Sequence, residues 1–512
     1  MDLPDPRKVH ARPVARVGGI GVVIGSLASI YLWLPVDNTI GAYLFGSIVL
    51  LLFGAWDDCR DLGHYVKFVG QFIAVVAIVY WGDVWVSSLP LVGEELPQHV
   101  GRPFTVVAIV GMINAINHSD GLDGLAGGES LLSLGCIAYL AHLADGFALT
   151  GVAVAIIGGL TGFLRYNTYP ARIFMGDSGS QFLGFSVGVL AVLLTQRVDR
   201  SISMALPALI LGLPIIDILA VLAQRVYHKM NWFQATKNHI HHRLLELGFD
   251  HYQAVLIIYS IQALFVVSAI FLRYESDSLL LSLYLGVCAL IFALLLIAER
   301  AQWKVVNHVA ESGLTTIVKR AKATRLFADG PTLFVKASVP LYFLLGSLWV
   351  QGVTAEFGLV AITFVGILSL ALILHWLPLS RYLLRLASYG TAAFLAYLIQ
   401  KYAVQGDSLL GRVEIGYFTA LGIAIALAVR YGRDTQFRTT PMDYLLVFVV
   451  VASAFLQREL IQDSSAGALV IKVFILFYGS ELILNARERR WNGLLDISVL
   501  ASSGILALKA FV

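Results

Sequence analysis

Charged residues are scarce in this sequence. Asp, Glu, Lys and Arg make up 13% of its 512 residues, against ~25% in an ordinary soluble domain. Hydrophobic residues make up 58%, and the mean hydropathy is +0.79. This balance excludes a water-soluble protein. The net charge is only +3, so the composition predicts no nucleic-acid partner.

Cysteine is scarce as well. Cys59, Cys136 and Cys288 lie far apart, so their spacing fits neither a metal site nor a disulfide framework. They indicate no redox role. A cleavable signal peptide is not expected either, because residues 1–16 are polar and basic and the apolar run after them is long enough to cross a membrane. We expect this first segment to lie in the cytosol.

Apolar runs long enough to cross a bilayer are abundant. Such runs are typical of membrane-spanning helices, in which the backbone polar groups must form hydrogen bonds within the segment. The first 300 residues contain ten predicted spans, at about 17–35, 40–56, 66–82, 103–117, 125–143, 148–164, 180–195, 203–222, 255–272 and 279–298. The sequence therefore predicts an all-α, polytopic membrane helical bundle.

Basic residues predict the orientation of these spans. Arg7, Lys8, Arg12 and Arg16 precede the first span, and by the positive-inside rule they hold the N-terminus in the cytosol. Each even-numbered span then ends on the cytosolic side. The polar segments expected on that face are 57–65, 118–124, 165–179 and 223–254.

A basic stretch follows the tenth span and marks a boundary. It divides the chain into a first membrane domain (1–300), a basic cytosolic linker (301–336) and additional membrane helices of unassigned role (337–512). About seven more spans are predicted there, near 337–352, 356–377, 384–400, 415–430, 442–456, 466–486 and 494–511.

The first polar cluster lies at the cytosolic end of the second span. Asp57 and Asp58 stand there, and Lys67 enters the third span. A carboxylate at a span end reaches water, so an ordinary solvated helix end explains the two acids equally well. Two adjacent acids ahead of a basic residue are also suited to hold Mg²⁺ or to handle a phosphate. Both interpretations stay open.

The second cluster contains Asn117, Asp120 and Asp123, in a segment that reads Asn-His-Ser-Asp-Gly-Leu-Asp-Gly. Two Asp-Gly steps end a helical run in a turn where glycine lets backbone amides approach a ligand. The turn lies between two apolar spans, with amides and acids packed at the membrane surface. We therefore favour a functional site over an ordinary tight turn.

The third cluster contains Asn167 and Phe174 and ends in Gly-Asp-Ser-Gly at residues 176–179. A turn of this kind that opens a helix presents N–H groups and a positive dipole end to an anion. Asp177 is then placed to ligate a metal that the same anion bridges. An N-cap role for Asp177 or Ser178 is compatible with this interpretation.

The fourth cluster is histidine-rich. His239, His241 and His242 are followed by Arg243 in the largest of the early polar segments. Zinc is disfavoured, because no acid or thiol at a helical spacing completes a site. Contacts with phosphate, by charge or by hydrogen bonding, are the favoured interpretation.

Together the clusters point to phosphoryl transfer. Acids for a metal, glycine turns for phosphate, and basic or imidazole groups supply the positioning and charge neutralisation on which that reaction depends. Because all four lie on one membrane face, we expect a water-soluble phosphate donor and an acceptor whose tail lies in the lipid.

The motifs, in this order, resemble those of the polyprenyl-phosphate N-acetylhexosamine-1-phosphate transferases, which belong to glycosyltransferase family 4. The resemblance covers about residues 1–300. The motifs that carry it are Lys8 to Pro13 with Arg16 to Gly19, Asp57-Asp58 with Lys67, Asn114 to Ala126, Asn167 with Phe174 to Ser180, and Pro214, Asp217 and His239 to Arg243.

The resemblance implies a reaction. N-acetylhexosamine 1-phosphate passes from a UDP-N-acetylhexosamine to undecaprenyl phosphate, which gives undecaprenyl-diphospho-sugar and UMP and starts a cell-surface polysaccharide such as the O-antigen of lipopolysaccharide. It implies Mg²⁺ as the cofactor, with Mn²⁺ as the alternative ion, and an active site on the cytosolic side of the bacterial inner membrane. A homodimer is compatible with it.

The same resemblance implies roles for residues. Asp57, Asp58 and Asp177 are the expected catalytic residues, and Asp177 with Asp58 is expected to hold the metal. Which of Asp57 and Asp58 is the base stays open. The expected substrate-binding residues are Lys67, Asn117, Asp120, Asp123, Asn167, Phe174, His239, His241, His242 and Arg243.

The alternative function is a secondary transporter, because polytopic proteins with acids in their spans often move ions or solutes. A transporter predicts acids near the middle of the bilayer and a repeated half. The sequence instead places its acids at span ends and contains no evident second copy of the clusters.

Overall fold

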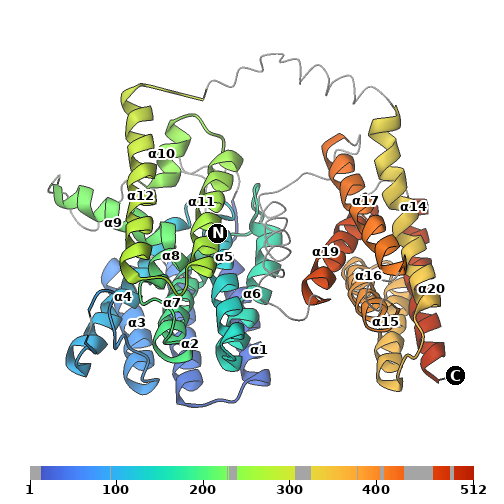
Figure 1. Ribbon diagram of the computed structural model, residues 1–512, viewed down its shortest axis with the longest axis horizontal. Coiled ribbons are helices and arrows are strands. Elements are labelled where there is room, and N and C mark those ends of the chain that lie inside the picture. Colours follow the sequence, from blue (N-terminus) through green and yellow to red (C-terminus); the bar gives the residue numbers. More distant parts are fainter. Residues whose placement is uncertain are drawn as a thin grey trace. The chain divides into compact units, whose positions relative to one another are not determined.

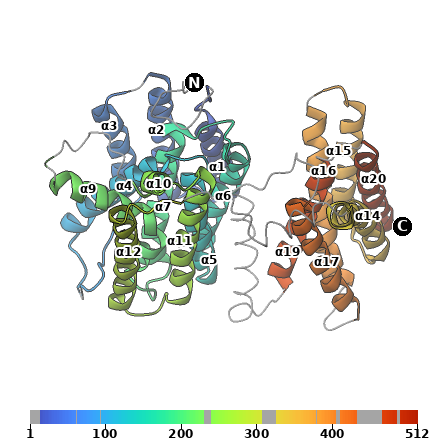
Figure 2. The same ribbon diagram turned by 90° about the horizontal axis from the view of Figure 1, so that it is seen from above.

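The computed structural model describes residues 13–60, 62–92, 94–227, 229, 239–305, 325–377, 379–403, 409–431, 465–484 and 489–511 (Figures 1 and 2). Within these ranges the chain forms eighteen α-helices and no strand. Eleven of the described helices are long and apolar enough to cross a membrane. The prediction of an all-α, multi-pass membrane protein is confirmed. The motif around Lys8 and the predicted span 442–456 lie outside the described residues.

The chain divides into two compact units, Met1–Asn307 with Thr440–Leu445, and His308–Thr439 with Leu446–Val512. The helices of the first unit are α1 (Gly18–Trp33), α2 (Asn38–Arg60), α3 (His64–Val76) continued by the π-helix η1 (Ala77–Trp81), α4 (Gln98–Ser119), α5 (Leu125–Leu143), α6 (Phe147–Asn167), α7 (Gly176–Leu193) continued by the π-helix η2 (Leu194–Val198), α8 (Leu206–Ile210), α9 (Gly212–Tyr227), α10 (Ile240–Glu246), α11 (His251–Phe271) and α12 (Asp277–Arg300).

Helix α7 is the central helix of the first unit. In its most apolar stretch 89% of the residues are buried, against 22% in α12, and it packs against α1, α2, α4 and α5 (Figure 2). Two glycines permit these close crossings. A Cβ atom at Gly54 of α2 would lie 2.4 Å from Ser178 Cα, and one at Gly19 of α1 would lie 2.3 Å from the backbone nitrogen of Gly179. The start of α7 is thereby held against the ends of two other helices.

The predicted eighth span is wrong as one continuous helix. It breaks at Leu211 into α8 and α9, and Figure 1 shows α9 leaving the direction of α8. Pro214 lacks an N–H group, which favours the break. Side chains bind the backbone groups that the break frees: Gln262 accepts from the Leu213 N–H at 3.2 Å and donates to the carbonyl of Ile210 at 2.9 Å. Irregular backbone within a membrane protein is tolerated when protein groups satisfy it.

The fourth predicted span is longer than expected. Helix α4 begins at Gln98, directly after Pro97, because its polar first turn continues the helix instead of ending it. The other predicted spans of the first 300 residues each correspond to one helix, with a π-helical end in α3 and α7.

The second unit is a separate helical bundle. Its core contains Phe343, Leu368, Leu395 and Leu476, and Lys472 forms a largely buried ion pair of 2.8 Å with Glu414. The described helices are α14 (Arg325–Trp349), α15 (Ala355–Ile373), α16 (Leu379–Leu398) continued by the π-helix η3 (Ile399–Ala403), α17 (Leu409–Tyr431), α19 (Ser465–Leu484) and α20 (Arg489–Phe511).

Candidate active site

An ion-paired triad forms the centre of the site. The ammonium group of Lys67 lies 2.7 Å from Asp57 Oδ2 and 2.8 Å from Asp177 Oδ2. The three residues come from α3, the last turn of α2 and the first turn of α7. The Asp57 side chain is 3% exposed, whereas those of Asp177 and Lys67 are 19% and 23% exposed. The structure thus joins the first and third polar clusters, with Asp177 and Lys67 facing outward.

Asp58 binds the start of α7. Its carboxylate accepts hydrogen bonds from the backbone N–H groups of Asp177 at 3.0 Å and Ser178 at 3.2 Å, and from the Ser178 hydroxyl at 3.1 Å. Gly176 has φ +71°, and a Cβ there would lie 2.5 Å from Asp58 Oδ2. The anion expected at this helix start is therefore a side chain of the protein itself, and Asp58 positions Asp177.

Amide side chains complete the surroundings of Asp177. Asn117 Nδ2 donates to Asp177 Oδ1 at 3.3 Å and to Ser180 Oγ at 2.8 Å. Gln181 Nε2 donates to Asp177 Oδ2 at 3.2 Å. The sequence reasoning did not single out Gln181. The signal was present, because Gln181 is a polar residue four positions after Asp177, on the same face of an apolar helix.

The sequence reasoning also missed Gln71, which extends the hydrogen bonds between amide side chains. Gln71 Nε2 donates to Gln181 Oε1 at 3.4 Å, and Gln71 Oε1 accepts from Asn114 Nδ2 at 2.8 Å. Gln71 follows Lys67 by four residues, so both side chains lie on one face of α3. This network ties α3, α4 and α7 together beneath the triad.

Residues 120–124 form a turn between α4 and α5 that carries Asp120 and Asp123, called the acidic turn below. Asn167 holds this turn. Its Oδ1 accepts from the Gly124 N–H at 2.9 Å, and its Nδ2 donates to the carbonyl of Ile173 at 2.9 Å. Asp123 Oδ2 accepts from the Ala171 N–H at 2.8 Å, and the Tyr259 hydroxyl donates to the carbonyl of Gly124 at 2.6 Å. The second and third clusters therefore form one connected surface. The roles of Asp123 and Asn167 in binding the uridine stay predictions.

Asp120 lies in a strongly acidic environment. Burial and the charges of Asp177, Asp123 and Asp58 raise its pKa to about 7. A carboxyl surrounded by carboxylates indicates an excess of negative charge, which a divalent cation would balance.

The segment that leads into Asp177 pairs with the chain before α1. The Phe174 N–H donates to the carbonyl of Ala15 at 2.8 Å, and the Gly18 N–H donates to the carbonyl of Phe174 at 3.0 Å. The half-buried Phe174 is thus fixed through its backbone. The part of the N-terminal motif that the structure describes therefore reaches the same site.

The segment 239–243, called the histidine segment below, contacts α9 and the acidic turn. His239 Nδ1 lies 2.7 Å from Asp217 Oδ2, and the Ile240 N–H donates to Asp217 Oδ1 at 2.9 Å. His241 packs so closely on the turn that a Cβ at Gly121 would lie 2.3 Å from its Nε2. Burial, together with the neighbouring His242, lowers the pKa of His241 to about 3. His241 is therefore neutral, which favours hydrogen bonding over charge as its means of contacting a ligand.

Arg243 pairs with an acidic residue of α12. Its Nε and Nη2 donate to the two carboxylate oxygens of Glu299 at 2.6 and 2.9 Å, at the end of α12. A bidentate pair of this geometry orients both partners. The predicted contact of Arg243 with substrate therefore requires that the pair with Glu299 opens, or that the guanidinium group binds Glu299 and the substrate at the same time.

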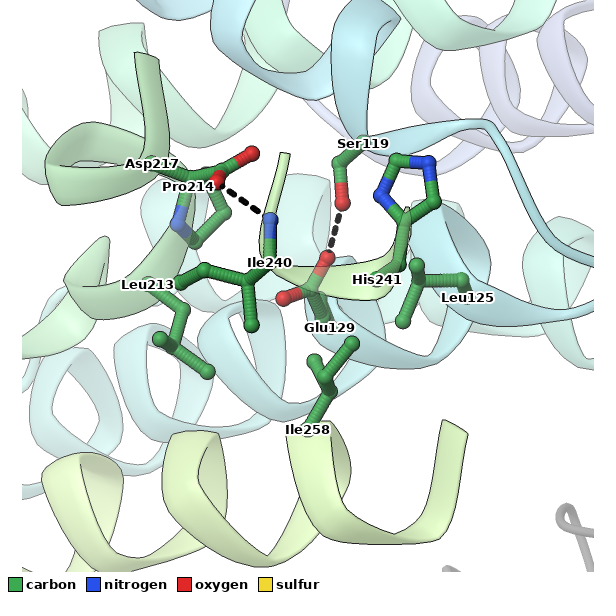
Figure 3. Close-up of a pocket in the computed structure, with 9 residues that line it drawn as sticks. All are labelled: Ser119, Leu125, Glu129, Leu213, Pro214, Asp217, Ile240, His241 and Ile258. Atoms are coloured by element: carbon green, nitrogen blue, oxygen red, sulfur yellow. Dashed lines mark hydrogen bonds between the residues drawn. The ribbon is translucent and has the colours of Figure 1, made fainter. Parts of the chain in front are cut away.

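A small pocket lies between the acidic turn and the histidine segment (Figure 3). Glu129 is 2% exposed, and its carboxylate accepts a hydrogen bond from the Ser119 hydroxyl. Ser119 precedes the turn and Glu129 follows it, so this bond joins the two ends of the loop 120–124. The sequence reasoning missed Glu129, although a single acid inside an apolar span is an unusual feature.

We expect Glu129→Leu to raise the KM for the sugar-phosphate donor about 10-fold, because a lost buried hydrogen bond of ~1–2 kcal/mol loosens the acidic turn. Glu129→Gln keeps an acceptor oxygen for Ser119 and is expected to stay within about 3-fold of the wild type. Steady-state kinetics and thermal unfolding of both variants measure this. Equal KM values for the two variants would contradict the role of the Ser119–Glu129 hydrogen bond in holding the acidic turn.

Asp177 is the residue of the triad that suits a magnesium ion. Mg²⁺ prefers oxygen ligands and usually takes one or two carboxylates, with phosphates and water as its other ligands. Among the described residues, no group of three or more His, Cys, Asp or Glu side chains is placed to hold a metal. A metal bound here would therefore need ligands from the substrate or water as well. Asp177 is the more exposed of the two triad carboxylates, at 19% against 3% for Asp57, and the acidic surroundings of Asp120 would supply negative charge to balance the ion.

The acids occupy helix ends. Asp57 and Asp58 lie in the last turn of α2, Asp177 lies in the first turn of α7, and Asp120 and Asp123 lie between α4 and α5. The transporter alternative predicts these carboxylates at mid-depth, so the structure favours the transferase.

Fold and site together define a polytopic membrane enzyme that handles a phosphorylated substrate at the ends of its helices. The sequence model of glycosyl transferase family 4 matches residues 40–195. The probable undecaprenyl-phosphate N-acetylglucosaminyl 1-phosphate transferase of Bacillus subtilis is 36% identical over 299 residues, which cover 57% of this chain and 82% of that protein.

Two further relatives agree. The decaprenyl-phosphate N-acetylglucosaminephosphotransferase of Mycobacterium leprae is 32% identical, covering 50% of this chain and 72% of its own length. The undecaprenyl-phosphate alpha-N-acetylglucosaminyl 1-phosphate transferase of Escherichia coli K12 is 28% identical, covering 54% and 77%. The chain belongs to the polyprenyl-phosphate N-acetylhexosamine-1-phosphate transferase family, and it is a membrane phospho-sugar transferase.

Proposed function

We propose that this chain transfers N-acetylhexosamine 1-phosphate from a UDP-N-acetylhexosamine to undecaprenyl phosphate, releasing UMP, with Mg²⁺ as the cofactor. The reaction is placed at the cytosolic face of the bacterial inner membrane, where its product starts a cell-surface polysaccharide. The observation that carries the proposal is the triad of Asp57, Lys67 and Asp177 at helix ends. The names of the relatives support a polyprenyl phosphate acceptor and an N-acetylglucosamine phosphate donor.

Two anions must meet in this reaction, which makes charge neutralisation its main requirement. Asp177, assisted by Asp58, would hold the Mg²⁺, which would supply positive charge to neutralise the diphosphate of the donor and the leaving UMP. Lys67 donates to phosphate oxygens. Asp58 fixes the backbone of Asp177 and Ser178, so the carboxylate of Asp177 is held ready at the start of α7.

We assign the base to Asp57. Asp58 accepts three hydrogen bonds at the start of α7, whereas Asp57 accepts one from the Leu62 N–H at Oδ1, at 2.6 Å, and contacts Lys67 through Oδ2. A carboxylate beside the attacking phosphate oxygen can remove its proton when the lipid phosphate is singly protonated. Asp123, Asn167 and Phe174 are assigned to the uridine end of the donor, and Asp120 is assigned to substrate binding.

The test is release of UMP by purified protein from UDP-N-acetylglucosamine and undecaprenyl phosphate in the presence of Mg²⁺. We expect a lipid-linked sugar diphosphate to appear in equal amount, and EDTA to reduce the rate to background. A panel of UDP-hexosamines then identifies the sugar. Turnover that needs no divalent cation contradicts the assigned metal, and release of UDP instead of UMP contradicts the reaction.

A further inference from the structure

The position of Lys67 has a consequence for metal binding. Its ammonium group contacts one oxygen of each of two carboxylates, at 2.7 Å from Asp57 and 2.8 Å from Asp177. An ammonium has three N–H donors, so two of them suffice for these contacts. With 23% of its side chain exposed, Lys67 can also turn toward a ligand that enters from outside.

The oxygens of Asp177 are already in use. Oδ2 accepts from Lys67 at 2.8 Å and from Gln181 at 3.2 Å, while Oδ1 accepts from Asn117 at 3.3 Å. A carboxylate oxygen has about two lone-pair sites. Both sites of Oδ2 are therefore taken, so a cation can bind through both oxygens of Asp177 only after a donor leaves Oδ2.

The ammonium group of Lys67 opposes the metal as well. It offsets one of the three negative charges of Asp57, Asp58 and Asp177. A divalent cation at Asp177 would stand within a few ångströms of the ammonium, and two cations repel strongly at that distance in a partly buried site. The metal alone is therefore a poor ligand for this site as long as Lys67 remains between the carboxylates.

A diphosphate removes the conflict. Its oxygens accept hydrogen bonds from an ammonium and also coordinate a divalent cation. When Lys67 turns to the phosphates, Oδ2 of Asp177 becomes accessible, and the added negative charge balances both cations.

We propose that Lys67 couples metal binding to donor binding, so that the divalent cation and the nucleotide diphosphate each raise the affinity of the enzyme for the other. By linkage the enhancement is the same in both directions. The inference rests on the proposed function, because it takes Asp177 as the metal ligand and a nucleotide diphosphate as the donor.

The experiment measures Mn²⁺ binding to the purified full chain by electron paramagnetic resonance, without lipid acceptor, with and without UDP. Binding of Mn²⁺ to UDP alone is measured separately and subtracted. For the wild type we expect saturating UDP to raise the Mn²⁺ affinity at least about 10-fold, the lower range of typical coupling between sites. For Lys67→Met we expect tighter Mn²⁺ binding without UDP, and an effect of UDP of no more than about 3-fold.

Two variants serve as controls. Lys67→Arg keeps the charge and is expected to keep the weak binding of Mn²⁺ without UDP. Lys304→Met removes an exposed lysine outside the site and is expected to behave like the wild type. If Lys67→Met does not fold, the wild type alone decides, because an Mn²⁺ affinity that does not respond to UDP overturns the coupling.

The outcomes separate this inference from the proposed function. Equal and unenhanced Mn²⁺ binding in the wild type and Lys67→Met overturns the coupling, while UMP release would still support the reaction. Absence of Mn²⁺ binding in every protein, with and without UDP, overturns the metal assignment and the coupling together.

Discussion

Asp177→Asn is expected to lower the rate of sugar-phosphate transfer by about 10³-fold, because it removes the negative charge that Lys67 contacts and that the proposed metal would contact. Such a loss corresponds to about 4 kcal/mol of transition-state stabilisation. The amide retains the shape of the side chain and one oxygen, so the contact from Asn117 is kept at Oδ1. The measurement is kcat and KM for the donor, with UMP as the detected product.

A matched control is Asp145→Asn. Asp145 is an exposed acid between α5 and α6 with φ +54°, a conformation that asparagine adopts as readily as aspartate. It makes the same chemical change outside the triad, and we expect full activity. If Asp177→Asn loses less than about 10-fold while remaining folded, the central role of Asp177 is wrong.

Gly54→Ala is expected to lower kcat about 100-fold, since an atom at that position would lie 2.4 Å from Ser178 Cα and must push α2 and α7 apart by roughly 1 Å. Gly54 lies three and four residues before Asp57 and Asp58, so its face of α2 is the one that carries the acids. The new methyl group meets backbone, which yields less than a side chain. The free energy of unfolding should also fall, by about 1–3 kcal/mol.

The control for this prediction is Gly111→Ala. Gly111 lies within α4, and a Cβ there would have no atom within 4 Å. Both substitutions raise helix propensity by the same ~1 kcal/mol, so that contribution cancels in the comparison. We expect Gly111→Ala to be active and at least as stable as the wild type. Equal activity of the two variants would show that the crossing of α2 and α7 tolerates the displacement.

Much of the fold was predictable from the sequence. The length of the apolar runs decides which segments can cross a bilayer, and the polar breaks between them decide where the acids fall along each span. Asp57, Asp177 and Asn117 were expected on a shared face, and in the structure Lys67 contacts both acids while Asn117 donates to Asp177. The break between α8 and α9 was not predicted, because the run 203–222 stays apolar across Leu211.

Contacts between spans were not predictable. Gln71, Gln181 and Glu129 are single polar residues inside apolar helices, and the sequence does not say toward which neighbour each one points. The pairing of Arg243 with Glu299 was unforeseen for the same reason, since 56 residues separate them.

The sequence by itself determined that this protein is a bundle of membrane helices with its polar motifs at their ends, because hydrophobic length and the order of residues are local properties of the chain. Only the tertiary structure decided that Lys67 stands between Asp57 and Asp177, and that Asp58 binds the start of α7. Those contacts depend on how far each helix is rotated and how closely two backbones approach. Side-chain packing between distant segments sets both, as the glycine crossings at Gly54 and Gly19 illustrate.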